Sequence, residues 1–365
     1  MVKALYLHIP FCSQKCPYCD FVSFVEAPLD HRAYLELLLR ELELYRDFEI
    51  LPESLYFGGG TPSLIKPELY AWFFKELSKR IDLSHVEEAS LEINPEDYSL
   101  EDFSKLRDTG INRVSIGIQS LREEGLRALG RKHTVKRAVE AVENAHRAGF
   151  ENINIDLIFG YEGQTAKELK EELERALELP IKHLSLYLLT PYEDTQFGHL
   201  YERGLLKLPS EDSIADMYEL ACELLEGAGF YHYEVSNFAL EGFQCRHNLA
   251  YWSHEEFLGL GVSAWSFINK VRFGNTRNIR LYARKVLEGK KPVEYEEVLE
   301  GKELLYDYLF TALRTSRGVP KELLRGLEPE LYEFFEEKGG RLALNRRGML
   351  LINEVLLRLK KAILL

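Results

Sequence analysis

The sequence predicts an α/β protein built around a partial (β/α)6 TIM-like barrel, with a smaller, mainly helical C-terminal domain. Two observations predict this fold. Six short runs rich in β-branched and aromatic residues recur before residue 190, and each ends in Gly, Pro, Gln or Thr. Amphipathic stretches with apolar residues at helical spacing separate these runs. This alternation of strand and helix favours a parallel sheet that curves into a barrel.

The six predicted strands follow one another at a regular pace. Their expected bounds are residues 4–10, 53–60, 88–95, 113–119, 152–160 and 183–190. Residues 35–48 and 138–148 show the helical pattern between them. In parallel barrels the functional groups lie at the C-terminal ends of the strands. The residues of chemical interest follow or end such strands: Gly58, Gly59, Gly60, Thr61, Glu92, Asn94, Gln119 and Asp156.

The alternation breaks down after about residue 200. A strand is expected near 231–238, and the sequence from about residue 280 is mainly helical. Its last part reads helix, short strand, then strand or helix, with Gly339-Gly340 before the strand, which is compatible with a winged-helix-like domain. We therefore expect a barrel domain with its C-terminal extension at 1–275 and a second domain at 276–365.

Composition and charge exclude several classes of protein. The chain has 46 basic and 59 acidic side chains, so its net charge of -13 repels nucleic acid and anionic lipid surfaces. Its first residues, MVKALYLHIPFC, have neither the length of a membrane span nor a small-residue cleavage site. We expect a cytoplasmic protein that does not bind nucleic acid.

A basic stretch at the C-terminus departs from the acidic composition. Residues 341–365 hold six basic side chains against one acidic side chain, and they end in Ala-Ile-Leu-Leu. This pattern leaves open a contact with nucleic acid, with a partner, or peripherally with a membrane. A small domain docked on the barrel would explain the apolar positions equally well.

Three of the five cysteines lie close together near the N-terminus. Cys12, Cys16 and Cys19 have the spacing C-x3-C-x2-C, and an odd cysteine count in a cytoplasmic chain argues for metal ligation over disulfides. Thiolates suit iron–sulfur clusters, and three of them leave one iron of a [4Fe-4S] cluster open to an outside ligand. A zinc site completed by His8 or a distant histidine is the alternative.

These residues resemble the radical S-adenosylmethionine superfamily, and more narrowly its coproporphyrinogen III dehydrogenase-like branch. The resemblance extends over nearly the whole chain. It rests on the run from Tyr6 to Cys19, the Gly58-Gly59-Gly60-Thr61-Pro62 turn, Glu92-Ile93-Asn94-Pro95, residues 112–120, residues 154–160 and His247-Asn248-x2-Tyr251-Trp252.

The resemblance implies a cofactor site. Cys12, Cys16 and Cys19 would hold a [4Fe-4S] cluster whose open iron binds the amino and carboxylate groups of S-adenosylmethionine. An electron from the cluster would then break the C5'–S bond of this cofactor, although cleavage in turnover stays open. The remaining residues implied to contact the cofactor or flank the cluster are Tyr6, Gly58, Gly59, Gly60, Thr61, Glu92, Gln119, Arg131 and Asp156.

Within this branch the sequence is similar to the HemW-type haem chaperones. The oxidases have a fourth cysteine where this chain has Phe21, and a long N-terminal extension that is not expected here, because the first strand begins at about Ala4. The resemblance implies haem as cargo, apo-haemoproteins such as respiratory enzymes as acceptors, and an electron donor for the cluster. It implies no coproporphyrinogen III dehydrogenase activity. That activity, or hydrogen abstraction from another tetrapyrrole-like substrate, is the alternative function.

His247 is the candidate haem ligand, because a neutral imidazole is a good axial ligand for haem iron. The same motif could instead build a polar corner against the barrel. Cys245 could ligate iron as a thiolate, whereas Cys222 lies among leucines and is expected in the core. Trp265 stands where relatives generally have a histidine, which removes one titratable ring from that loop.

Overall fold

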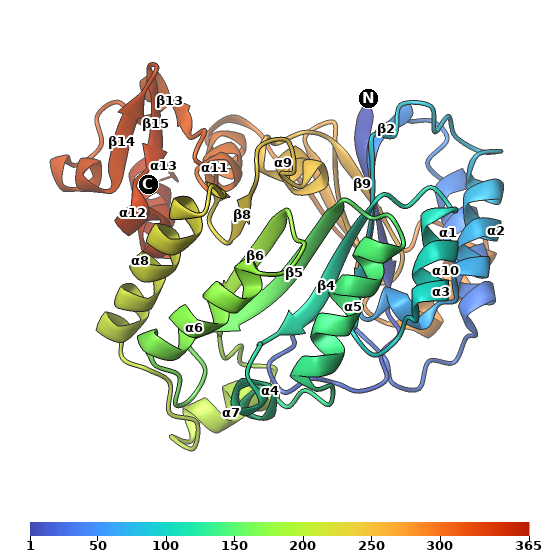
Figure 1. Ribbon diagram of the computed structural model, residues 1–365. Coiled ribbons are helices and arrows are strands. Elements are labelled where there is room, and N and C mark those ends of the chain that lie inside the picture. Colours follow the sequence, from blue (N-terminus) through green and yellow to red (C-terminus); the bar gives the residue numbers. More distant parts are fainter. Residues whose placement is uncertain (365) are drawn as a thin grey trace.

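The computed structural model describes residues 1–364 and has one large curved sheet as its framework (Figure 1). The sheet has twelve strands in the order β12-β11-β10-β9-β1-β2-β3-β4-β5-β6-β8-β7, so it is an open barrel with β12 and β7 at its edges. Leu365, the last residue of the predicted apolar tail, lies outside the described residues. The predicted partial α/β barrel is confirmed.

All six predicted strands form, and they pair in parallel in chain order. They are β1 (Val2–Ile9), β2 (Ile50–Gly59), β3 (Glu88–Ile93), β4 (Arg113–Gln119), β5 (Asn152–Phe159) and β6 (His183–Leu188). A seventh parallel strand, β9 (Phe257–Leu260), pairs with β1 from the other side. Its place beside the first strand was not predicted, because four residues carry too little pattern.

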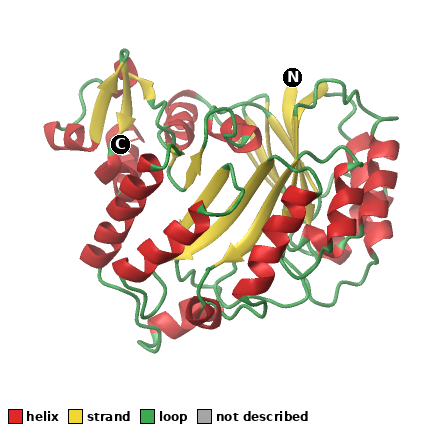
Figure 2. Cartoon of the chain, in the orientation of Figure 1, coloured by secondary structure: helices red, strands yellow, loops and turns green. Residues whose placement is uncertain are grey.

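Helices cover the outer face of this sheet (Figure 2). Most begin at a side-chain cap, as where Ser99 and Asp102 form a capping box. The helices of the first part of the chain are α1 (His31–Glu43), α2 (Pro67–Leu77), α3 (Leu100–Arg107), α4 (Glu123–Ala128), α5 (Val135–Arg147), α6 (Ala166–Leu177), α7 (Gln196–Glu202) and α8 (Glu211–Gly227), with a 3-10 turn at Pro62–Leu64.

The two faces of the parallel sheet differ in polarity. Side chains alternate along a strand, so Ala89, Leu91 and Ile93 of β3 join the apolar core. Glu88 and Glu92 lie on the opposite, inner face. Buried polar groups on the other parallel strands continue this inner face, which therefore provides the site with polar side chains.

The second half of the chain extends both edges of the sheet. Residues 231–238, expected as one strand, form instead the hairpin of β7 (Tyr231–Glu234) and β8 (Asn237–Ala239), and β8 pairs with β6. The helix α9 (Arg246–Trp252) then leads to β9. Beyond it lie β10 (Trp265–Ile268), β11 (Val271–Asn275), α10 (Ile279–Leu287) and β12 (Val293–Val298). Because β12 pairs with β11, the domain boundary predicted at residue 275 falls between two hydrogen-bonded strands of one sheet.

The C-terminal region forms a small unit beside α8 (Figure 1). It has a three-stranded antiparallel sheet flanked by helices. Its elements are α11 (Gly301–Ala312), β13 (Val319–Pro320), 3-10 turns at Lys321–Leu324 and Pro329–Phe334, β14 (Phe335–Lys338), β15 (Arg341–Leu344), α12 (Arg346–Leu350) and α13 (Ile352–Leu364).

Most of the basic side chains of this region have partners within the chain. Arg346 pairs with Glu219 and Glu226 of α8, and Arg358 pairs with Glu328 and Glu330. These pairs favour docking of the unit on the barrel over an outward-facing basic patch. Within residues 1–364, no helix has both the length and the apolar character that crossing a membrane requires.

Candidate functional site

Two adjoining cavities open at the inner face of the barrel. The smaller one, of about 420 Å³, is lined by all three clustered cysteines. The larger one, of about 750 Å³, extends towards α9 and the strands β9 to β12. Five residues line both cavities: Asp20, Phe21, Gly59, Glu92 and Tyr187. The two cavities therefore share a wall, which two of the predicted site residues help to form.

The loop after β1 carries the three cysteines to the mouth of the smaller cavity. All three thiols are free and partly exposed. The hydroxyl of Thr61 donates to Cys12 Sγ at 3.5 Å, and Arg131 Nη1 donates to Cys16 Sγ at 3.3 Å. Donors of this kind stabilise thiolates, the form that binds iron. The cysteine loop thus has the chemistry of an iron–sulfur ligand set.

Arg131 anchors the floor of the smaller cavity. Its Nη2 donates to Asn94 Oδ1 at 2.9 Å and to the carbonyl of Gly117 at 3.2 Å. Its Nε is buried and has no hydrogen-bond partner within residues 1–364. A buried donor without a partner is costly, so this atom fits a cavity that holds an anionic or carbonyl-bearing ligand.

The glycine run at the end of β2 packs tightly against the cysteine loop. Gly60 N–H donates to the carbonyl of Ile9 and Thr61 N–H to the carbonyl of Phe11. A Cβ on Gly58 would lie 2.9 Å from the Glu92 carboxylate, and one on Gly60 would lie 2.6 Å from the Phe11 carbonyl. Gly59 and Gly60 line the smaller cavity, but Gly58 does not. Packing alone therefore requires small residues here, in addition to any approach of a cofactor.

Two partly buried carboxyl groups face the smaller cavity from β3 and β5, the strands on either side of β4. Glu92 accepts from the Tyr56 hydroxyl and from Gly59 N–H, both at 3.0 Å. Burial, reinforced by the nearby Asp156, raises the pKa of Glu92 to about 7. Burial also raises the pKa of Asp156, which accepts from Ser115 and Asn154. The pair can accept hydrogen bonds from hydroxyl groups of a bound molecule.

Gln119 ends β4 in a strained conformation. Its φ is +62°, which is uncommon for a residue other than glycine, and the register of β4 on β5 shifts just before it. Such strain is typical of functional positions. The side chain lines the smaller cavity, so the predicted site residue lies where a ligand can reach it.

Tyr187 is a cavity residue that the sequence did not single out. It lies on β6, opposite Ile158 of β5, and lines both cavities with 42% of its surface exposed. Because side chains alternate along a strand, Tyr187 shares the inner face of β6 with His183. This alternation could be predicted from the sequence, but it does not indicate that the position borders a cavity.

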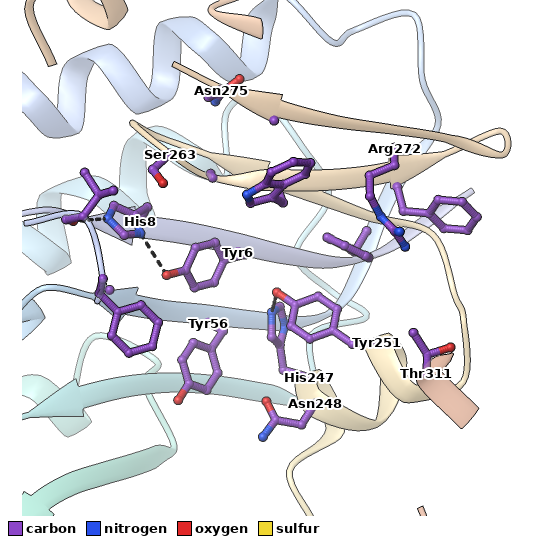
Figure 3. A pocket seen from close by; sticks show the side chains of 18 of the residues that line it. Tyr6, His8, Tyr56, His247, Asn248, Tyr251, Ser263, Arg272, Asn275 and Thr311 are labelled. Atoms are coloured by element: carbon purple, nitrogen blue, oxygen red, sulfur yellow. Dashed lines mark hydrogen bonds between the residues drawn. The ribbon is translucent and has the colours of Figure 1, made fainter. Parts of the chain in front are cut away.

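Tyr6 belongs to the larger cavity and not to the cysteine cavity (Figure 3). Its hydroxyl is 3.0 Å from His8 Nδ1. The other ring nitrogen of His8, Nε2, lies 2.8 Å from the carbonyl of Val22, in the loop after the cysteines. Both nitrogens of His8 are therefore engaged, and the zinc site that would use this histidine is not favoured.

His247 lies almost fully buried on the wall of the larger cavity (Figure 3). Its Nδ1 lies 3.0 Å from the Ser54 hydroxyl and its Nε2 lies 2.7 Å from the Tyr251 hydroxyl. Burial lowers its pKa to about 3, so the ring is neutral. Ligation of haem iron by His247 remains a prediction, and it would require one of these hydrogen bonds to break.

The other two cysteines are buried. Cys245 lies 3.5 Å from Glu88 Oε1, and burial raises its pKa to about 12. A thiol held in this protonated form is a poor iron ligand. Cys222 lies in the main apolar core, as predicted.

Comparison with known proteins places this site in a class. A family model described as the radical SAM superfamily matches residues 6–176, the segment that carries the cysteine loop and most of the parallel strands. The haem chaperone HemW of Lactococcus lactis subsp. lactis is 40% identical over 320 residues, which cover 87% of this chain and 83% of the relative. HemW of Bacillus subtilis is 34% identical over 380 residues, covering 97% and 98%. The chain belongs to the HemW family of the radical SAM superfamily.

A solved structure shares the whole fold. The coproporphyrinogen III oxidase HemN of Escherichia coli, described as a radical SAM enzyme, superposes with a TM-score of 0.81. The match covers 98% of this chain and 89% of that chain at 23% identity. At this identity the likeness concerns the fold.

Proposed function

We propose that this chain is a haem chaperone that binds haem in the larger cavity and delivers it to apo-haemoproteins. A [4Fe-4S] cluster and S-adenosylmethionine would occupy the smaller cavity. The observation that carries the proposal is the open, aromatic-lined cavity of about 750 Å³ that shares a wall with the cysteine cavity. Its volume is in the ordinary range for cofactor sites.

The residues present fit the cluster and its ligand. Cys12, Cys16 and Cys19 would hold the irons, and the donors from Thr61 and Arg131 already face two of the sulfurs. Bound together, the cluster and S-adenosylmethionine would supply one-electron chemistry. Glu92 and Asp156 would accept hydrogen bonds from ribose hydroxyls, and Gln119 would border the same ligand.

The larger cavity fits a planar, mostly apolar ligand. Four aromatic side chains line it with exposed fractions of 42% to 59%, so together they form an exposed apolar patch inside one cavity. They are Phe21, Tyr187, Trp265 and Tyr295. Rings of this kind stack on other flat ring systems. The relatives named as haem chaperones give the ligand its identity in this proposal.

Anaerobic reconstitution with iron and sulfide, followed by titration with haem, tests the proposal. We expect one cluster and one haem per chain, and transfer of that haem to an apo-haemoprotein. Incubation with coproporphyrinogen III, reductant and S-adenosylmethionine should give no protoporphyrinogen IX. Failure of the reconstituted protein to bind haem would overturn the proposal.

Hydrogen abstraction from a tetrapyrrole-like substrate is the second candidate function. The shared wall favours it, because a ligand in the larger cavity would lie next to the smaller one across Gly59 and Tyr187. It predicts substrate-dependent formation of 5'-deoxyadenosine above the background without substrate. Formation of protoporphyrinogen IX would establish this function in place of the chaperone. The cytoplasmic location, the electron donor and any peripheral membrane contact remain predictions.

A further inference from the structure

Three histidines line the larger cavity, and their hydrogen bonds differ. Both ring nitrogens of His8 and both of His247 have partners within the chain. His254 uses only Nε2, which lies 2.7 Å from Asp307 Oδ2. Within residues 1–364, its Nδ1 has no hydrogen-bond partner and is not fully buried. His254 is therefore the cavity histidine with an accessible ring nitrogen.

Asp307 fixes the tautomer of His254. This carboxylate lies on α11 and is held by Arg272 through Nη1 at 2.5 Å and Nη2 at 2.7 Å. Burial disfavours its charge, but the bonds from His254 and Arg272 outweigh burial and lower its pKa. A charged carboxylate can only accept a hydrogen bond, so Nε2 is the donor, and in the neutral ring Nδ1 carries the lone pair. Histidines that bind metals commonly have such a carboxylate on the other nitrogen.

We propose that His254, through Nδ1, is the axial ligand of the haem iron in the larger cavity, in place of His247. This inference rests on the proposed function. It assigns the metal-binding role to the residue just after α9, two positions beyond the His247 to Trp252 motif. Asp307 is a positioning residue that orients the ring and increases its basicity.

The surroundings of His254 support this assignment. Its backbone φ of +57° belongs to the turn that ends α9, where His254 N–H donates to the carbonyl of Tyr251 and Glu255 N–H to that of Ala250. The ring lies 4.5 Å from the ring of Phe267, measured between centroids, and near Tyr308. Arg277 lines the same cavity, is exposed, and has no ion-pair partner in the described chain. A guanidinium at this edge can meet the carboxylate of a haem propionate.

Titration with two porphyrins separates ligation from stacking. Ferric protoporphyrin IX and metal-free protoporphyrin IX are added to wild type, His254→Ala and His247→Ala, with binding followed by absorbance. We expect His254→Ala to lower the affinity for the iron porphyrin at least tenfold and to shift its Soret band. The affinity for the metal-free porphyrin should be unchanged, and free imidazole should restore the wild-type spectrum.

His85→Ala, at an exposed position outside the cavity, is the matched control and should bind both porphyrins like wild type. A wild-type spectrum and affinity in His254→Ala would overturn the inference while leaving the proposed function intact. A shift of the Soret band in His247→Ala alone would have the same consequence. Equal losses for both porphyrins in His254→Ala would also overturn it, because they would indicate a damaged cavity. Absence of haem binding by wild type would instead overturn the proposed function.

Discussion

At the scale of single residues, Gly59 is a position where the site tolerates little change. Its φ is +112°, and a Cβ there would lie 2.5 Å from the ring of His8. We expect Gly59→Ala to lower the free energy of unfolding by about 3 kcal/mol, because a strained backbone and a steric overlap add together. Urea denaturation followed by circular dichroism measures this change.

Gly110 provides the matched control. Its φ is +106°, but a Cβ there would meet no atom within 4 Å. Gly110→Ala should therefore lower the free energy of unfolding by only about 1 kcal/mol, the contribution of backbone strain alone. Equal decreases in the free energy of unfolding of the two variants would contradict the expected overlap between a Cβ at position 59 and the ring of His8.

The sequence indicated which residues gather at the site but not what surrounds them. The cysteine spacing, the glycine turn and the strand-end carboxyl groups were all predicted, and most of them line one cavity. Tyr6 was expected in the same site but lines the other cavity. The alternation of side chains along β1 could predict that Tyr6 faces inward, but not which cavity it borders. His254 carries no signal in the sequence, since its free nitrogen depends on Asp307 of a distant helix.

At the scale of secondary-structure elements, a buried carboxyl group joins three parts of the fold. Glu41 of α1 accepts from Gly261 N–H after β9, from Asn275 at the end of β11 and from Tyr282 of α10. The helical pattern of α1 could not predict this role, because a glutamate in a surface helix is normally solvated. The three partners lie more than 200 residues away along the chain.

The stability of this junction should depend on pH. Burial raises the pKa of Glu41 from 4.5 to about 7, and bonds from Tyr282, Gly261 and Asn275 oppose this only partly. The folded protein then holds the proton while the unfolded chain releases it, so the contribution of Glu41 to stability falls as pH rises from about 4.5 to 7. Its size is about 3 kcal/mol, at about 1.4 kcal/mol per pKa unit.

Comparison of wild type with Glu41→Gln isolates this contribution, because other groups titrate in both proteins. Unfolding free energies at pH 5 and pH 8 should fall less with pH in Glu41→Gln than in wild type. Glu36→Gln, on the solvent side of the same helix and paired with Arg32, should behave like wild type. An identical pH dependence in wild type and Glu41→Gln would show that Glu41 is charged when buried.

At the scale of the whole molecule, the two halves of the chain supply different cavities. The first half carries the parallel strands that line the cysteine cavity, and their regular alternation made them predictable. The second half supplies most of the larger cavity from short strands, β9 to β12, and from α9. Strands of four to six residues paired across long sequence distances leave little pattern, so this cavity could not be predicted.

Trp265 shows how the second half builds its cavity wall. Its indole lies over Gly274, where a Cβ would lie 3.1 Å from ring atoms, so glycine on β11 makes room for the ring on β10. The ring of Tyr295 on β12 lies 5.2 Å away, measured between centroids. Trp265 and Tyr295, whose rings are tilted by 58° to each other, thus form an aromatic surface over Gly274, with 46% of Trp265 exposed.

This surface should bind porphyrins whether or not they carry iron. We expect Trp265→Leu to lower the affinity for haem and for metal-free protoporphyrin IX by about fivefold each, since an aromatic pair contributes about 1 kcal/mol beyond its buried area. His254→Ala, in contrast, should affect haem alone. Tyr201→Leu, at an exposed aromatic position on α7 outside both cavities, should change neither affinity. A Trp265→Leu protein with wild-type affinity for both porphyrins would mean that the tetrapyrrole binds away from β10 to β12, and that the larger cavity serves another ligand.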